Sequence, residues 1–137
     1  MGPMQHFAIT TVAEESADFR QVLWTGKHVQ LAIMTIPPGE ETGEETHEDT
    51  DQVLTFISGV GEAIVAGERK SVAVGDLVAV PAGTLHNFAN TGVNPLILHT
   101  LYGPPEHAAY AVHATKEAAE AAEESGQDEP LQLSAPE

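Results

Sequence analysis

The sequence predicts an all-β barrel or jelly roll followed by one short C-terminal helix. Between Lys27 and Gly103, short apolar runs of strand-forming residues are separated every 8 to 12 residues by Gly, Pro, Asn and Asp. Eight or more such strands with hairpin-length loops favour closure into a barrel or roll, because closure protects edges that a flat sheet would expose. Beyond the barrel the composition changes to Ala, Glu and Lys, which are good helix formers.

The strands are expected within residues 27–114, with residues 1–26 forming an N-terminal segment that joins the barrel. In the first strand Val29, Leu31 and Ile33 alternate with their neighbours, which is the period of a strand. That strand has to end at Pro37, because proline has no amide hydrogen to donate to a ladder. Further strands are expected at residues 43–47, 52–58, 60–66, 70–74, 77–80, 85–90 and 96–102.

A helix is expected at residues 115–124. Thr115 is placed to cap its N-terminus, and Gly126 lies just beyond its end. Residues 125–137 combine Pro, Gly, Gln and acidic residues without periodicity, so we expect a disordered tail there.

Composition excludes several kinds of function. The chain has 137 residues, which suits one domain, and its formal net charge of −16 repels nucleic acids and anionic membranes. No apolar run approaches the ~20 residues needed to cross a bilayer. Zero cysteines remove disulfides, thiolate ligands and cysteine nucleophiles. The N-terminus does not read as a secretory signal, so we expect a cytoplasmic protein.

Potential metal ligands gather in two places along the chain. Glu45 and His47 are two residues apart and project from the same face if they lie on one strand. A polar, turn-like stretch follows, so Gln52 can open the returning strand beside His47. His86 follows the rigid turn that begins at Pro81, and a barrel can bring it opposite the first hairpin.

The spacing of these residues resembles the two motifs of the cupin superfamily. The first motif is Gly, His, His, Glu and Gly, and this sequence has Gly39, Glu45, His47, Gln52 and Gly59 in the same frame. The second motif is met in full by Gly75, Pro81, Gly83, His86 and Asn90. The two motifs occur in the right order over about half of the chain, so the resemblance is specific.

The resemblance implies a metal site with His47 and His86 as imidazole ligands, Glu45 in place of a usual His and Gln52 in place of a usual Glu. The two departures leave the formal charge of the ligand set unchanged, because three His with one Glu and two His with one Glu and one Gln each carry one negative charge. The implied cofactor is one divalent ion, and mixed nitrogen and oxygen donors suit iron, manganese, zinc, nickel or copper. Glu45 could instead act as a base beside the metal, and the neutral Gln52 also fits a cupin that has lost its metal.

For function, the resemblance implies a metal-dependent enzyme of oxygenase, isomerase or lyase type. With only five Lys and Arg residues a phosphate clamp is hard to build, so we expect a small neutral or weakly acidic organic substrate. A non-catalytic sensor or carrier for a small molecule is the alternative. A homodimer is expected by analogy with other cupins. The candidate pocket residues on the inner strands are Phe56, Phe88, Leu98, His99, Thr100 and Tyr102.

Overall fold

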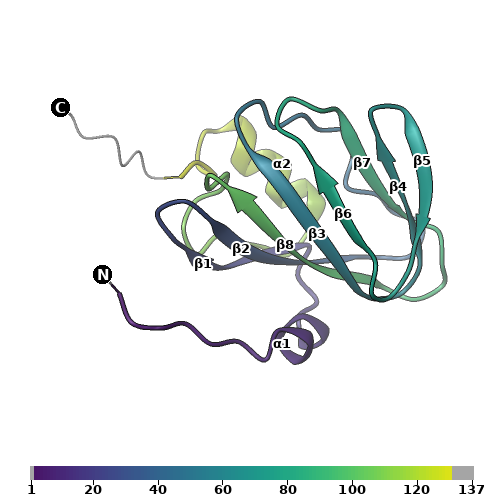
Figure 1. Ribbon diagram of the computed structural model, residues 1–137, viewed down its shortest axis with the longest axis horizontal. Helices are drawn as coiled ribbons and strands as arrows, with labels where there is room; N and C mark the ends of the chain where they lie inside the picture. The colour runs from purple at the N-terminus through teal and green to yellow at the C-terminus, as the bar shows by residue number, and fades with distance from the viewer. Residues whose placement is uncertain (1, 131–137) are drawn as a thin grey trace.

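The computed structural model describes residues 2–130 as a two-sheet β-barrel with one helix near each end (Figure 1). The strands are β1 (Arg20–Thr25), β2 (Gln30–Ile36), β3 (Asp51–Ser58), β4 (Gly61–Val65), β5 (Glu68–Val72), β6 (Leu77–Val80), β7 (His86–Asn90), β8 (Leu96–Gly103) and β9 (Val112–His113). The helices are α1 (Ile9–Glu15) and α2 (Lys116–Glu124). The predicted all-β barrel with a C-terminal helix is confirmed.

The two sheets are antiparallel and enclose the main core. The larger sheet has the strand order β6-β3-β8-β2-β1-β9, and the smaller one has the order β5-β4-β7. Side chains alternate along each strand, so one set faces inward. Phe56, Phe88, Leu98 and the α2 residue Ala119 belong to this inner core. Helix α2 therefore packs on the barrel interior, whereas α1 covers part of the outer face of the larger sheet.

Three elements were not predicted. Helix α1 places Ala13 against Ile33 and Ile97 on the outer face of the sheet. Strands β1 and β9 extend that sheet beyond β2. All three have a weak signal in the sequence, because α1 has seven residues, β9 has two, and a register shift interrupts β1 between Val22 and Trp24.

The strand expected at residues 43–47 is not formed, so that prediction is wrong. Within that segment the chain makes one isolated bridge, between Glu45 and His86, and a second bridge pairs the earlier residue Glu41 with Ala89. Gly43 has a φ of 90°, which is outside the range of a strand, so the segment cannot follow the edge of β7 as a regular ladder. Glu45 and His47 are consequently held by a loop next to β7.

The C-terminal part agrees with the sequence in one respect and differs in another. Thr115 caps α2 by accepting a hydrogen bond from the amide of Ala118. Disorder was expected from residue 125, but the structure describes residues 125–130, and Asp128 among them is buried. Residues 131–137 of that expected tail lie outside the described residues. Within residues 2–130, neither helix is long and apolar enough to cross a membrane.

Candidate metal centre

Backbone hydrogen bonds bring Glu45 and His47 beside His86, although about 40 residues separate them in sequence. The amide of Glu45 donates to the carbonyl of His86 over 2.9 Å, and the amide of His86 donates back to the carbonyl of Glu45 over 2.9 Å. The amide of Gly83 donates to the carbonyl of His47 over 2.8 Å. The rigid turn of the second motif is thus joined to the loop that carries the first motif.

The three side chains converge. One ligand atom from each of Glu45, His47 and His86 lies within 4.8 Å of the other two. Nε2 of His47 lies 4.0 Å from Oε1 of Glu45, and the imidazole centroids of His47 and His86 are 5.1 Å apart. Two imidazole nitrogens and one carboxylate oxygen at these separations are a donor set that a divalent transition metal or zinc prefers.

Both imidazoles are oriented through their other nitrogen. Nδ1 of His86 lies 2.9 Å from the carbonyl oxygen of Thr84, which can only accept, so Nδ1 carries the hydrogen. Nδ1 of His47 lies 3.2 Å from Oε2 of Glu106. Each contact leaves the Nε2 lone pair for a metal, which is the arrangement commonly found around metal-binding histidines.

Gln52 lies in the inner wall of the barrel on β3, paired with Tyr102 of β8. Its Nε2 donates to Oγ1 of Thr100 over 3.1 Å, and this bond fixes the orientation of the amide. Its Oε1 is buried and has no hydrogen-bond partner among the described residues. A buried carbonyl oxygen without a partner is costly, and a metal ion would satisfy it, so Gln52 fits the role of an additional oxygen ligand.

Burial and neighbouring charges shift the pKa values of the site. Burial raises the pKa of Glu45. Burial also opposes the charged form of His47, but the hydrogen bond to Glu106 and the carboxylates of Glu106 and Glu45 outweigh it, so the pKa of His47 lies above its usual value. Burial lowers the pKa of His86. Excess negative charge therefore surrounds His47, which is the electrostatic environment that attracts a cation.

A pocket of about 760 Å³ opens beside Glu45 and His47. Its other walls come from residues 104–107 and from the C-terminal segment that includes Glu123, Asp128 and Glu129. Among the described residues that line it, none is a lysine or arginine and six are carboxylic acids: Glu45, Asp49, Glu106, Glu123, Asp128 and Glu129. The absence of a cation in the wall disfavours an anionic ligand such as a phosphate ester.

The six pocket residues expected from the sequence are not among the residues that line this pocket. Phe56, Phe88 and Leu98 are buried in the main core below it. Thr100 and Tyr102 face inward, where Thr100 holds Gln52 and the ring of Tyr102 lies 6.0 Å from that of His47. His99 alternates with the inward residues of β8 and so faces outward, paired with Ile33 on the α1 side of the sheet.

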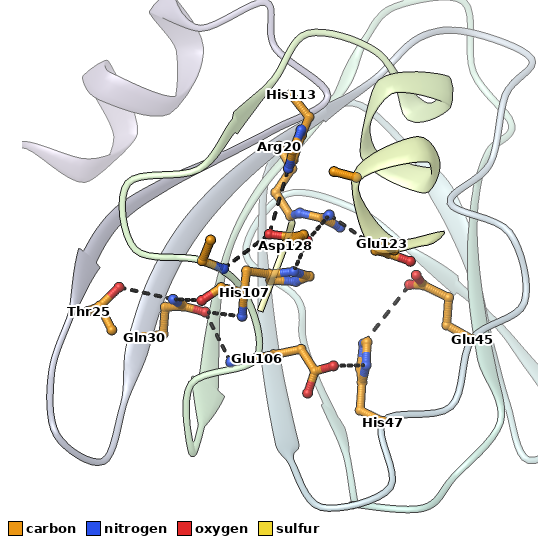
Figure 2. A network of polar contacts seen from close by, with 12 residues as sticks. Arg20, Thr25, Gln30, Glu45, His47, Glu106, His107, His113, Glu123 and Asp128 are labelled. Carbon is orange, nitrogen blue, oxygen red and sulfur yellow. Dashed lines mark hydrogen bonds and ion pairs between the residues drawn. The ribbon is translucent and has the colours of Figure 1, made fainter. Parts of the chain in front are cut away.

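A buried polar network forms the wall opposite the metal-ligand candidates (Figure 2). One carboxylate oxygen of Asp128 lies 2.7 Å from Nδ1 of His107 and 3.1 Å from the guanidinium of Arg20. The guanidinium also contacts Glu123 at 3.2 Å. Burial lowers the pKa of His107, which favours the neutral ring that donates from Nδ1. Burial also works to raise the pKa of Asp128, but the hydrogen bond from His107 outweighs it and leaves that pKa below its usual value.

Sequence reasoning did not identify this network. Arg20 and Asp128 are 108 residues apart, and no spacing rule relates a residue of β1 to one that follows α2. A second group of close ligand atoms exists in it, formed by His107, Glu123 and Asp128. Arg20 already pairs with both carboxylates of that group, so the guanidinium occupies the position where a second cation would be attracted.

Comparisons with known proteins agree with this architecture. The model of the family described as "Cupin domain" matches residues 32–102. The uncharacterized protein YrkC of Bacillus subtilis (strain 168) is 40% identical over 123 residues, which are 85% of this chain and 66% of that protein. The chain therefore spans just under two thirds of the length of that relative.

Two solved structures are also similar. The crystal structure of BH2720 from Bacillus halodurans is 36% identical with a TM-score of 0.85, and the match covers 88% of this chain and 96% of that one. The crystal structure of a predicted oxalate decarboxylase from Thermotoga maritima is 25% identical with a TM-score of 0.55, and the match covers 58% of this chain and 69% of that one.

Proposed function

Because the chain belongs to the cupin family, we propose that it is a metal-dependent enzyme that acts on a small neutral or weakly acidic organic molecule. One observation carries the proposal: ligand atoms of Glu45, His47 and His86 converge within 4.8 Å, and both imidazoles are oriented through Nδ1. The similarity to a predicted oxalate decarboxylase supports an enzymatic role. We also propose a cytoplasmic location for the protein.

The chain supplies the metal ligands and a binding pocket whose negative charge repels anions. His47, His86 and Glu45 would hold one divalent ion of iron, manganese, zinc, nickel or copper, with Oε1 of Gln52 as a weaker ligand. When bound, such an ion acts as a Lewis acid on a carbonyl or enol oxygen. The pocket of about 760 Å³ has room for a small organic molecule beside this site, and its carboxylates disfavour an anionic substrate.

A non-catalytic carrier or sensor is the second candidate. The neutral amide of Gln52 favours it, because an amide is a weaker metal ligand than the carboxylate usual at this position of the motif. A ligand that raises the melting temperature equally with and without a chelator would support this second candidate, since binding would then be independent of metal.

A turnover screen tests the proposal. Protein loaded separately with each of the five ions is incubated with a panel of small enols, phenols, keto compounds and dicarbonyl compounds, and products are detected by mass spectrometry. We expect turnover with at least one ion and its loss after treatment with chelator. Ligand binding without turnover under any metal condition would contradict the enzymatic assignment and leave the carrier or sensor.

Replacement of Gln52 by Glu is expected to tighten zinc binding by about tenfold, or ~1.4 kcal/mol, because a carboxylate takes the place of a neutral amide oxygen. Without metal, the same buried carboxylate beside Thr100 is expected to lower the melting temperature. Competition titration against a coloured chelator measures the first effect, and thermal unfolding measures the second. Gln127→Glu, at an exposed position, is the control. Equal zinc affinity in the wild type and Gln52→Glu would remove Gln52 from the ligand set.

We further propose that the protein is a homodimer that pairs through the outer face of the larger sheet. An apolar row crosses four neighbouring strands of this face, because Trp24 pairs with Leu31, Leu31 with Leu101, and Leu101 with Val53. Trp24 is 37% and Leu101 is 40% exposed. In a chain of formal net charge −16, an uncharged apolar row is where two copies approach with the least repulsion.

Light scattering tests the dimer. The wild type is expected to have twice the mass of one chain, and Leu101→Glu is expected to have the mass of one chain, because the new carboxylates would face each other across the interface. Val93→Glu, which adds the same charge at a loop residue that is 87% exposed, is expected to stay dimeric. A monomeric wild type would refute the proposal.

A further inference from the structure

The loop that follows β8 carries a side chain that touches a metal-ligand candidate. Glu106 is half-buried, and its Oε2 lies 3.2 Å from Nδ1 of His47. No other described residue is recorded within hydrogen-bond or ion-pair distance of that nitrogen. A carboxylate only accepts, so a neutral His47 that donates to Glu106 would carry its hydrogen on Nδ1 and keep the lone pair on Nε2, the nitrogen nearer Glu45.

Gln30 fixes the backbone of this loop from the barrel side. Its side chain is fully buried on β2. Its Oε1 accepts hydrogen bonds from the amides of Glu106 at 3.1 Å and of His107 at 2.9 Å. Its Nε2 donates to the carbonyl of His107 at 2.8 Å and to Oγ1 of Thr25 at 2.9 Å. Only an amide side chain can make this combination of two accepted and two donated bonds.

Asp128 holds the same loop from the other side. Its carboxylate accepts from Nδ1 of His107 at 2.7 Å and from the amide of Ala108 at 3.1 Å. Figure 2 shows Gln30 and Asp128 on either side of this loop, with Glu106 extended from it towards His47. The loop is clamped at three consecutive residues, so the position of the Glu106 carboxylate is set by the fold.

We propose that Glu106, held in place by Gln30, is a positioning residue that sets the tautomer and the ring orientation of His47 for metal binding. The proposal rests on the metal site proposed above. It explains why the loop is clamped so extensively at Gln30, since a carboxylate can orient an imidazole only if its own position is fixed. Loss of a residue that orients a metal ligand without binding the metal itself typically weakens metal binding by 10- to 100-fold.

Zinc affinity and the tautomer of His47 test the proposal together. Affinity is measured by competition with a coloured chelator, and the tautomer by two-bond ¹H–¹⁵N correlation spectra of the metal-free protein at alkaline pH. For Glu106→Ala we expect zinc binding weakened by about 10- to 100-fold, together with loss of the Nδ1–H tautomer of His47. Glu106→Gln keeps an acceptor oxygen, so we expect it to restore the tautomer and part of the affinity.

Two further sets of variants test whether Glu106 affects zinc binding by positioning His47 or only through its charge or the stability of the fold. Glu129→Gln removes a carboxylate from the same pocket without a recorded contact to a ligand candidate, and we expect wild-type affinity and tautomer. Gln30→Leu is expected to weaken zinc binding, and the double variant Gln30→Leu/Glu106→Ala is expected to bind zinc no more weakly than Glu106→Ala alone. Additive losses in the double variant would show that Gln30 acts independently of Glu106.

The outcomes distinguish this proposal from the metal site on which it rests. If the wild type binds no metal, the metal site fails, and the spectra still decide whether Glu106 sets the tautomer of His47. If the wild type binds zinc and Glu106→Ala keeps both the affinity and the Nδ1–H tautomer, the metal site stands and the role of Glu106 is overturned.

Discussion

His86→Ala is expected to lose the divalent ion that the wild-type protein binds at about one per chain. His86 supplies one of two imidazoles in the proposed site, and the remaining donors would be oxygens and one ring nitrogen. We expect the affinity for the ion to fall by more than about 100-fold. Loss of a residue that only orients a metal ligand typically costs 10- to 100-fold, and His86 is proposed to bind the ion directly. Elemental analysis of untagged protein, purified without chelator and compared with protein reloaded with each candidate ion, measures the effect and names the metal.

His99→Ala is the matched control for this experiment. Like His86, His99 is a strand histidine, but it is half-buried on β8 of the larger sheet and faces outward, whereas His86 is buried on β7 of the smaller sheet. We expect it to keep the wild-type metal content. Equal metal content in the wild type and His86→Ala would place the ion elsewhere, and no metal in any sample after reloading would favour the metal-independent carrier or sensor.

Asp128→Ala is expected to lower the free energy of unfolding by about 3–5 kcal/mol, the usual cost of breaking a buried ion pair. The Asp128 side chain is 0% and the Arg20 side chain 3% exposed, and among the described residues Glu123 would be the one remaining carboxylate paired with the guanidinium. Nδ1 of His107 and the amide of Ala108 would lose their acceptor at the same time. Urea unfolding followed by circular dichroism measures the change.

Glu123→Ala provides the comparison, because it removes the other carboxylate from the same guanidinium. The Glu123 side chain is 38% exposed, so solvent screens this pair and we expect a loss of about 0–1 kcal/mol. If the two variants lost the same stability, burial would not strengthen the pair of Asp128 with Arg20, and the expected difference between the buried and the exposed ion pair would be wrong.

The ligand candidates could be predicted from the sequence because they follow local rules. Glu45, His47 and His86 lie in motifs whose turns fix the chain, and the reciprocal bridge between Glu45 and His86 brings the two motifs together. The strands of the barrel could be predicted for the same reason, since glycine and proline mark their ends. The loop at residues 43–47 was mistaken for a strand, because alternation of side chains does not show whether a neighbouring strand edge is available.

The pocket walls could not be predicted, because they depend on the register of strands and on contacts between distant segments. His99 and Thr100 are adjacent in sequence, and only the pairing of β8 with β2 and β3 decides which of them faces inward. Glu106 and Asp128 carry no motif. Their roles arise from Gln30 and Arg20, which lie 76 and 108 residues away in the sequence.

The pairing of Arg20 with Asp128 also bears on the order in which the protein is assembled during synthesis. A ribosome releases the residues of the metal-ligand motifs, and then β8, before residues 127–130. The barrel strands can therefore pair while one wall of the pocket is still missing. A nascent chain at that stage would hold its ligand side chains beside a wider pocket, because Asp128, Glu129 and Pro130 line part of the wall in the finished fold.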